Sequence, residues 1–104
     1  MGQVVIVAYR PKVGKEEELL ALTREHYGIL REQGLVSPRP PIIVRTKDGT
    51  LVEIFEWESG AMERAHANPA VLELWKRYEA ACDYVPLSEL AETENLFAAF
   101  EAVN

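Results

Sequence analysis

Residues 57–71 read WESGAMERAHANPAV and carry the strongest fold signal in this chain. An apolar, β-rich run ends at the first residue of this stretch, and Ser59 is placed to cap a helix over residues 61–67. Asn68 followed by Pro69 then starts a second helix, because an asparagine side chain accepts hydrogen bonds from the first turn and proline fits there without a donor. The stretch predicts a strand followed by two helical segments that change direction between them.

The residues before this stretch predict a β-hairpin. Two β-rich runs, residues 42–46 and 51–57, flank the turn sequence KDGT at residues 47–50. Asp-Gly between two such runs is one of the strongest local hairpin signals, because glycine adopts the positive φ that the tight turn requires. We therefore expect two paired strands here.

The N-terminal third predicts a strand and a helix. Val4 to Tyr9 is almost continuously apolar, which is typical of a strand covered on both faces. Three glutamates then open a helix at Glu16, where the helix dipole favours negative charge, and Gly34 is suited to end it. One face of this helix carries a mostly apolar stripe: Leu19, Leu22, Thr23, His26, Tyr27 and Leu30.

The C-terminal third predicts the remaining elements. The helix that starts after Asn68 is expected to continue until Pro86 stops it. One face of this helix carries a mostly apolar stripe: Val71, Trp75, Tyr78, Cys82 and Val85. A short helical turn over Leu87 to Ala91 and a last strand over Leu96 to Val103 follow.

This order is β-α-β-β-α-β, and it predicts an α+β fold of the ferredoxin-like kind. We expect a single domain over residues 1–104, with a four-stranded antiparallel sheet and both helices on one face. The first strand is apolar on both sides, with Val5 and Val7 on one face and Val4 and Ile6 on the other. Two helices cover only one face, so we expect the other to be buried in a homodimer, sheet against sheet.

Composition narrows the class of protein. A net charge of −6 and scattered basic residues make nucleic acid an unsuitable partner. No apolar run is long enough to span a bilayer and no signal-peptide pattern is present, so we expect a soluble, cytoplasmic protein without a membrane partner. Cys82 is the single cysteine, which excludes an internal disulfide and predicts a small core residue rather than a metal ligand.

The chain resembles the antibiotic-biosynthesis-monooxygenase-like domains of the dimeric α+β barrel superfamily. The likeness covers nearly the whole chain in element order, and it is sharpest at Glu56-Trp57-Glu58-Ser59 and Ala65-His66. Members commonly carry an aromatic where Trp57 stands and a histidine nine residues later, as here. The resemblance implies a homodimer and oxygenation without a cofactor, in which a deprotonated phenol or enol reacts with dioxygen and neither metal nor flavin is required.

Two positions depart from the family. Members often have a second histidine after the turn that follows the first, where this chain has Asn68-Pro69 and then Ala70 and Val71. The haem-degrading branch has an iron-ligating histidine further along this helix, and here the nearby residues are Trp75 and Lys76. Haem degradation is therefore disfavoured.

Two histidines are the candidate catalytic residues. His66 could act as a base or as the partner of an anionic ligand, because imidazole titrates near neutral pH. Its structural alternative is a capping role at the kink before Asn68. His26 lies in the apolar stripe and faces the sheet, where it is either a second polar contact to the ligand or a core histidine bonded to a backbone carbonyl. If both point inward, they would converge on one cavity.

Aromatic side chains and one carboxylate complete the candidate site. Four aromatics could form flat walls for an aromatic or polyketide-like ligand, or could simply be core: Tyr9, Trp57, Trp75 and Tyr78. Glu53 shares a strand face with Leu51 and Phe55, so its carboxylate needs a partner. A structural ion pair with Arg45 on the neighbouring strand is the favoured prediction, with a site acid or base as the alternative.

Three functions follow from these residues. The first is a small-molecule enzyme similar to the cofactor-independent monooxygenases, and the second is a non-catalytic dimeric binding or stress-associated module on the same fold. The third is a structural dimer whose cavity is filled by its own aromatics. A solvent-open cavity of a few hundred Å³ that touches His66 would separate the first two from the third.

Overall fold

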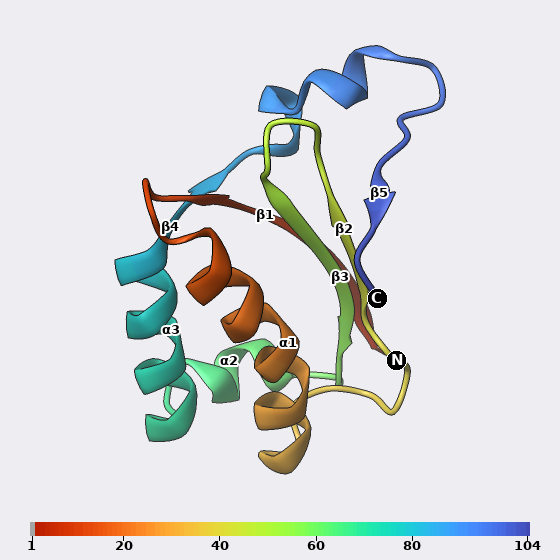
Figure 1. Cartoon of the computed structure of the whole chain (residues 1–104). Coiled ribbons are helices and arrows are strands. Elements are labelled where there is room, and N and C mark those ends of the chain that lie inside the picture. The colour runs from red at the N-terminus through yellow and green to blue at the C-terminus, as the bar shows by residue number, and fades with distance from the viewer. Residues whose placement is uncertain (1) are drawn as a thin grey trace.

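The computed structural model describes residues 2–104 and has an α+β architecture, with helices packed on one face of an antiparallel sheet (Figure 1). The elements are β1 Gln3–Pro11, α1 Glu16–Glu32, β2 Ile42–Arg45, β3 Leu51–Trp57, α2 Ala61–Ala65, α3 Pro69–Ala81, β4 Cys82–Val85 and β5 Glu101–Ala102, with 3₁₀ turns at Leu87–Glu89 and Ala91–Glu94. The strands lie in the order β4-β1-β3-β2-β5, and every neighbouring pair is antiparallel. This arrangement is compatible with a ferredoxin-like fold, although the sheet has five strands instead of four. No helix within residues 2–104 is long and apolar enough to cross a bilayer.

The predicted first helix is confirmed. α1 begins at Glu16, with three acidic residues in its first turn, and five residues of the predicted stripe are buried: Leu19, Leu22, Thr23, His26 and Leu30. This face of α1 packs toward the sheet and toward α3 (Figure 1). His26 is thereby held under the sheet, beside the middle of β3.

The predicted hairpin is also confirmed. β2 and β3 pair from Ile42 opposite Ile54 to Arg45 opposite Leu51, and Gly49 in the turn has a φ of +92°. The Thr46 hydroxyl and the Thr50 backbone N–H both donate to the Asp48 carboxylate. The hairpin places alternate residues of β3 against the helices.

The helix change after β3 occurs as predicted, but one of its two caps was predicted wrongly. The Asn68 carboxamide oxygen accepts hydrogen bonds from the backbone N–H groups of Ala70 (2.9 Å) and Val71 (3.2 Å), so it caps α3. Ser59 does not cap α2, because the residue that precedes this helix is Gly60, at a φ of +71° and without a side-chain cap. α2 is therefore a short segment between a glycine turn and the start of α3.

The prediction that the second long helix continues to Pro86 is wrong. α3 ends at Ala81, and residues 82–85 form β4, which pairs with β1 from Cys82 opposite Pro11 to Val85 opposite Ala8. The Lys12 backbone N–H also donates to the Ala81 carbonyl at 2.9 Å, which joins the end of α3 to the end of β1. Pairing along the free edge of β1 satisfies backbone groups that a longer helix would leave unpaired.

The predicted last strand over Leu96 to Val103 is also wrong in its bounds. Only Glu101–Ala102 is a strand, and it lies beside β2 at the opposite edge of the sheet from β4. The backbone at the end of β2 is satisfied by Val103, whose N–H donates to the Ile43 carbonyl, and by the Asn104 side chain, which accepts from the Ile43 N–H at 2.8 Å. Residues 96–97 lie outside the sheet and are almost fully exposed.

The two faces of the sheet have different environments. The outer face is covered at one end by Leu90 and Phe100, which pack on a cross-strand row that includes Ala8 and Val52. The next row, Ile6–Ile54–Ile42, crosses three strands with no such cover: Ile6 is 50% exposed and Ile42 is 54% exposed. The expectation of an uncovered apolar sheet face is therefore met over this half of the sheet.

Candidate functional site

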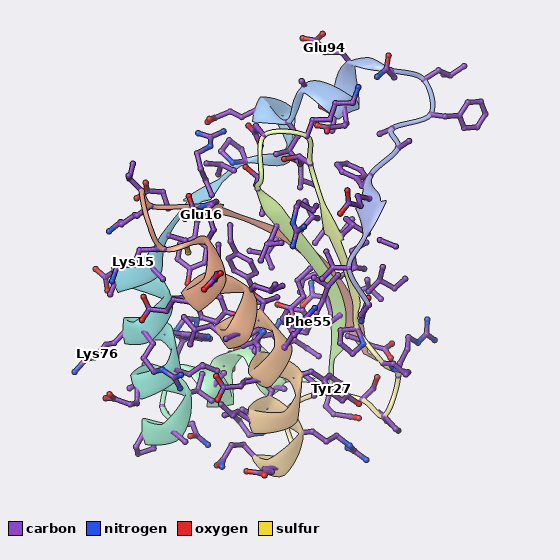
Figure 2. The ribbon with its side chains drawn as sticks, in the orientation of Figure 1. Lys15, Glu16, Tyr27, Phe55, Lys76 and Glu94 are labelled. Atoms are coloured by element: carbon purple, nitrogen blue, oxygen red, sulfur yellow. The ribbon has the colours of Figure 1, made fainter. Side chains whose placement is uncertain are left out.

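A pocket of about 570 Å³ lies between the sheet and the helices. β1, β3 and β4 form one wall, α1 and α3 form the other, and α2 contributes at one end. In Figure 2 the Phe55 side chain extends from β3 toward α1, while Lys76 on α3 points away from the sheet into solvent. The pocket is lined by Val5, Val7, Tyr9, His26, Phe55, Trp57, Met62, Trp75, Tyr78, Glu79 and Tyr84.

The polar centre of this wall is a buried pair formed by His26 and Glu53. The His26 Nδ1 atom lies 2.8 Å from the Glu53 Oε1 atom, and both side chains are almost completely buried. The Tyr9 hydroxyl donates to the same Oε1 atom at 2.7 Å, so this oxygen is an acceptor and Nδ1 carries the hydrogen that bonds to it. The other ring nitrogen, Nε2, is then left with its lone pair, and it makes no hydrogen bond within residues 2–104.

Strand register brings these groups together. Tyr9 on β1 and Glu53 on β3 lie on the helix-facing side of neighbouring strands, in adjacent cross-strand rows, since Tyr9 pairs with Leu51 and Val7 pairs with Glu53. His26 reaches them from the buried stripe of α1. Three separate elements therefore converge on one carboxylate.

Two tyrosines that line the pocket stay neutral, and their hydroxyl groups donate hydrogen bonds to other side chains of the protein. Burial, reinforced by the charge of Glu53, raises the pKa of Tyr9 well above its ordinary value, and the same two causes in the same order raise the pKa of Tyr78. The Tyr78 hydroxyl donates to the Thr23 hydroxyl at 3.2 Å, and its ring stacks on Tyr9 at 4.7 Å between centroids. Both hydroxyl hydrogens are donated within the protein, so neither tyrosine has a hydrogen left to donate to a ligand, and His26 Nε2 supplies the nitrogen lone pair of this part of the wall.

The charged groups near the pocket are acidic. Glu79 on α3 lines it, Glu53 lies behind His26, and no lysine or arginine is among the described residues that line it. A ligand that carries phosphate or carboxylate groups would find no fixed cation here to balance its charge.

His66 lies at a different place. It is exposed at the end of α2, its ring contacts the Trp75 ring edge to face at 5.1 Å, and it lines a separate depression of about 630 Å³. The expectation that His26 and His66 converge on one cavity is not met. The two hollows share only Trp57 and Met62, so His66 stands on the outer side of this shared wall.

Five of the six predicted site residues line the larger pocket together: His26, Tyr9, Trp57, Trp75 and Tyr78. The predicted ion pair between Glu53 and Arg45 is wrong, because Arg45 pairs with Glu101 at 3.4 Å and Glu53 pairs with His26. The physical reason is position along the sheet: Arg45 lies opposite Leu51, one cross-strand row from Glu53, and Glu101 is directly opposite it on β5.

Sequence reasoning missed some of the wall. The alternation along β1 signals Val5 and Val7, which share a face with Tyr9, but Met62 and Tyr84 depend on turns and strand ends that the pattern does not set. Within residues 2–104, no three or more histidine, cysteine or acidic side chains gather as a metal site would require. No family model, no curated protein and no solved structure matches this chain.

Proposed function

We propose that the pocket binds a small, flat, largely apolar molecule and that His26 takes a proton from a phenol or enol group of this ligand. The proposal is carried by one observation: a buried histidine, fixed through Nδ1 by Glu53, presents Nε2 in the wall of an aromatic-lined pocket. A neutral imidazole oriented in this way is a general base suited to neutral pH.

The reaction we propose is that of the cofactor-independent monooxygenases, which the sequence resembles. The ligand loses its hydroxyl proton to His26, and the electron-rich anion then reacts directly with dioxygen. The lining is mostly apolar, and Trp57 and Trp75 supply flat surfaces for the rings of the ligand. In this proposal His26, rather than His66, is the base.

We also propose that the chain adopts the ferredoxin-like fold of the dimeric α+β barrels and forms a homodimer. The Ile6–Ile54–Ile42 row supports this assembly, because an apolar row across three strands is suited to pack against the same row of a second copy. Such packing leaves the helices, and the pocket under them, on the outside of the dimer.

Oxygen consumption with anthrone or a quinol tests the catalytic role. His26→Gln should lower the rate about 10²- to 10⁴-fold, which is the usual contribution of a general base. His66→Gln is the matched control and should leave the rate within about twofold, because this ring lies outside the pocket. Equal rates in the native protein and in the His26 variant would end the proposed role of His26.

A thermal-shift measurement with the same compounds separates catalysis from binding. A ligand that binds only the folded protein raises its melting temperature, and at 100 times its Kd it adds about 2.7 kcal/mol of stability. Stabilisation without oxygen consumption would assign the pocket to the alternative, a non-catalytic binding module. Absence of both effects would mean that the pocket does not bind this class of ligand.

A further inference from the structure

A buried carboxylate behind the pocket wall has one oxygen without a partner. Glu53 has no exposed surface, and its Oε2 atom accepts no hydrogen bond from any residue in the described range 2–104. Its Oε1 atom accepts both available bonds, from Tyr9 and from His26. A buried carboxylate that is only half satisfied costs free energy and is retained where its charge has a use.

We propose that Glu53 is a positioning residue that makes the pocket select uncharged ligands with an acidic hydroxyl over carboxylates of the same shape. This inference rests on the proposed function, because it requires a ligand beside His26 Nε2. It goes beyond the choice of His26 as the base, because it gives Glu53 a role and states which ligands the pocket prefers.

The charge balance explains the selection. When the hydroxyl ligand is bound, its O–H bond breaks, the oxygen keeps the electron pair, and the proton forms a new bond to His26 Nε2. The Nδ1 hydrogen stays in its bond to Glu53, so the total charge of ligand, His26 and Glu53 is −1 before and after the transfer. The imidazolium then lies between two anions, the ligand oxygen and the Glu53 carboxylate, and its attraction to Glu53 is weakly screened because both of these side chains are buried.

A carboxylate ligand arrives already ionised and has no proton to give to His26 Nε2. The proton that would make an imidazolium beside it has to come from solvent. The charge of the ligand then faces Glu53 and the Glu79 carboxylate, with no lysine or arginine among the lining residues of the described chain. Repulsion of like charges should therefore weaken its binding.

Three nitrobenzene derivatives of nearly equal size test the proposal on the native protein: 4-nitrophenol, 4-nitrobenzoate and nitrobenzene. 4-Nitrophenol turns yellow when it ionises, so its absorbance reports proton transfer directly. We expect it to turn yellow on binding at a pH about one unit below its own pKa, which requires the bound pKa to fall by at least about one unit. We expect the Kd of 4-nitrobenzoate to be at least about tenfold higher than the Kd of 4-nitrophenol.

Glu53→Gln should abolish the colour while 4-nitrophenol still binds, because the amide keeps the shape and can accept the Tyr9 hydrogen bond but carries no charge. Glu63→Gln is the matched control, since it removes a carboxylate that lines only the separate depression and should leave the colour unchanged. Loss of colour in the Glu63 variant and not in the Glu53 variant would overturn the role of Glu53.

Tyr9→Phe is a second test, in which ionisation of the bound ligand should not fall. It does not depend on the stability of the Glu53 variant. Phenylalanine keeps the ring that stacks on Tyr78 and removes one donor to Glu53, so the carboxylate charge is less neutralised. Ionisation of bound 4-nitrophenol should then be equal to or greater than in the native protein. If Tyr9→Phe and Glu53→Gln both abolish the colour, the three residues are only a structural unit and the proposal is wrong.

The tautomer of His26 is a further measurement, and a purely structural role of Glu53 in packing would not change it. The chain has two histidines, so His66→Gln leaves one ring in the nitrogen NMR spectrum. We expect hydrogen on Nδ1 and a lone pair on Nε2, with this preference reduced in Glu53→Gln. Hydrogen on Nε2 in the native protein would overturn the proposal. Failure of nitrobenzene and 4-nitrophenol to bind, or binding to the native protein without ionisation, would contradict the proposed function itself. Ionisation in the native protein that is unchanged in Glu53→Gln would contradict only the role of Glu53.

Discussion

The buried residues of this protein show that the direction of a side chain matters more than its position in a motif. His66 belongs to the segment that carries the family likeness, yet it is exposed on the far side of Trp57 and Met62 from the larger pocket. His26 has no motif around it, and the helical stripe of α1 places it at the centre of the pocket. Amphipathic periodicity predicts that His26 is buried. Its contact with Glu53 depends on how α1 packs on β3, and this packing cannot be predicted from a single sequence.

Cys82 gives a prediction at the scale of one residue. It is 2% exposed, and burial, with a smaller contribution from Asp83, raises the pKa of its thiol to about 11. Because only the thiolate reacts, thiol–disulfide exchange at about pH 8 should be roughly two orders of magnitude slower in the folded protein than in urea. A disulfide reagent with a coloured leaving group measures both rates. Equal rates would show that the thiol is accessible and ordinary.

At the scale of elements, local signals were reliable where a few neighbouring residues determine the backbone. The Asp-Gly turn and the Asn-Pro helix start were predicted from the sequence because their backbone geometry follows from those residue types. β4 was missed because Cys82 and Val85 continue the apolar stripe of α3 at helical spacing. Residues 82–85 form a strand because they pair with the free edge of β1. This pairing is a tertiary effect, and the helical spacing of apolar residues cannot predict it.

The cap of α3 gives a prediction at this scale. Asn68→Ala removes the acceptor for two backbone N–H groups and should lower the free energy of unfolding by about 1 kcal/mol. Asn68→Asp keeps an acceptor and should recover most of the loss. Ser59→Ala is the control from the same segment and should change stability by less than about 0.5 kcal/mol, because Ser59 caps no helix. Urea denaturation measures all three, and equal losses for Ser59 and Asn68 would contradict the assigned caps.

At the scale of the whole molecule, the sequence predicted the class of fold and an uncovered apolar sheet face, but not the path of the C-terminal segment. Residues 96–100 read LFAAF and are apolar enough to predict a strand, yet Leu96 and Phe97 are almost fully exposed outside the sheet. The segment that returns to β2 covers the Ala8 end of the outer face and leaves the Ile6 end open. The extent of the open face therefore depends on a return path that has no local sequence signal.

The proposed homodimer gives a prediction at this scale. Each isoleucine buried between two sheets contributes about 1.5–3 kcal/mol, and a charge in its place is costly. Light scattering at low micromolar concentration should give about twice the 11.7 kDa chain mass for the native protein, and the single-chain mass for Ile6→Glu. Val13→Glu is the control, because Val13 is fully exposed in a loop away from this face, and it should keep the larger mass. A native protein with the single-chain mass would contradict the assembly.

The way in which the sheet ends limits how copies of this chain can associate. β4 has four residues and β5 has two, and the Asn104 side chain occupies the backbone N–H of Ile43 beside β5. Outer strands as short as these offer little template for another strand. In the proposed homodimer the copies meet face to face, and the short edges give little means to lengthen the sheet into a ribbon, so growth into fibres is discouraged.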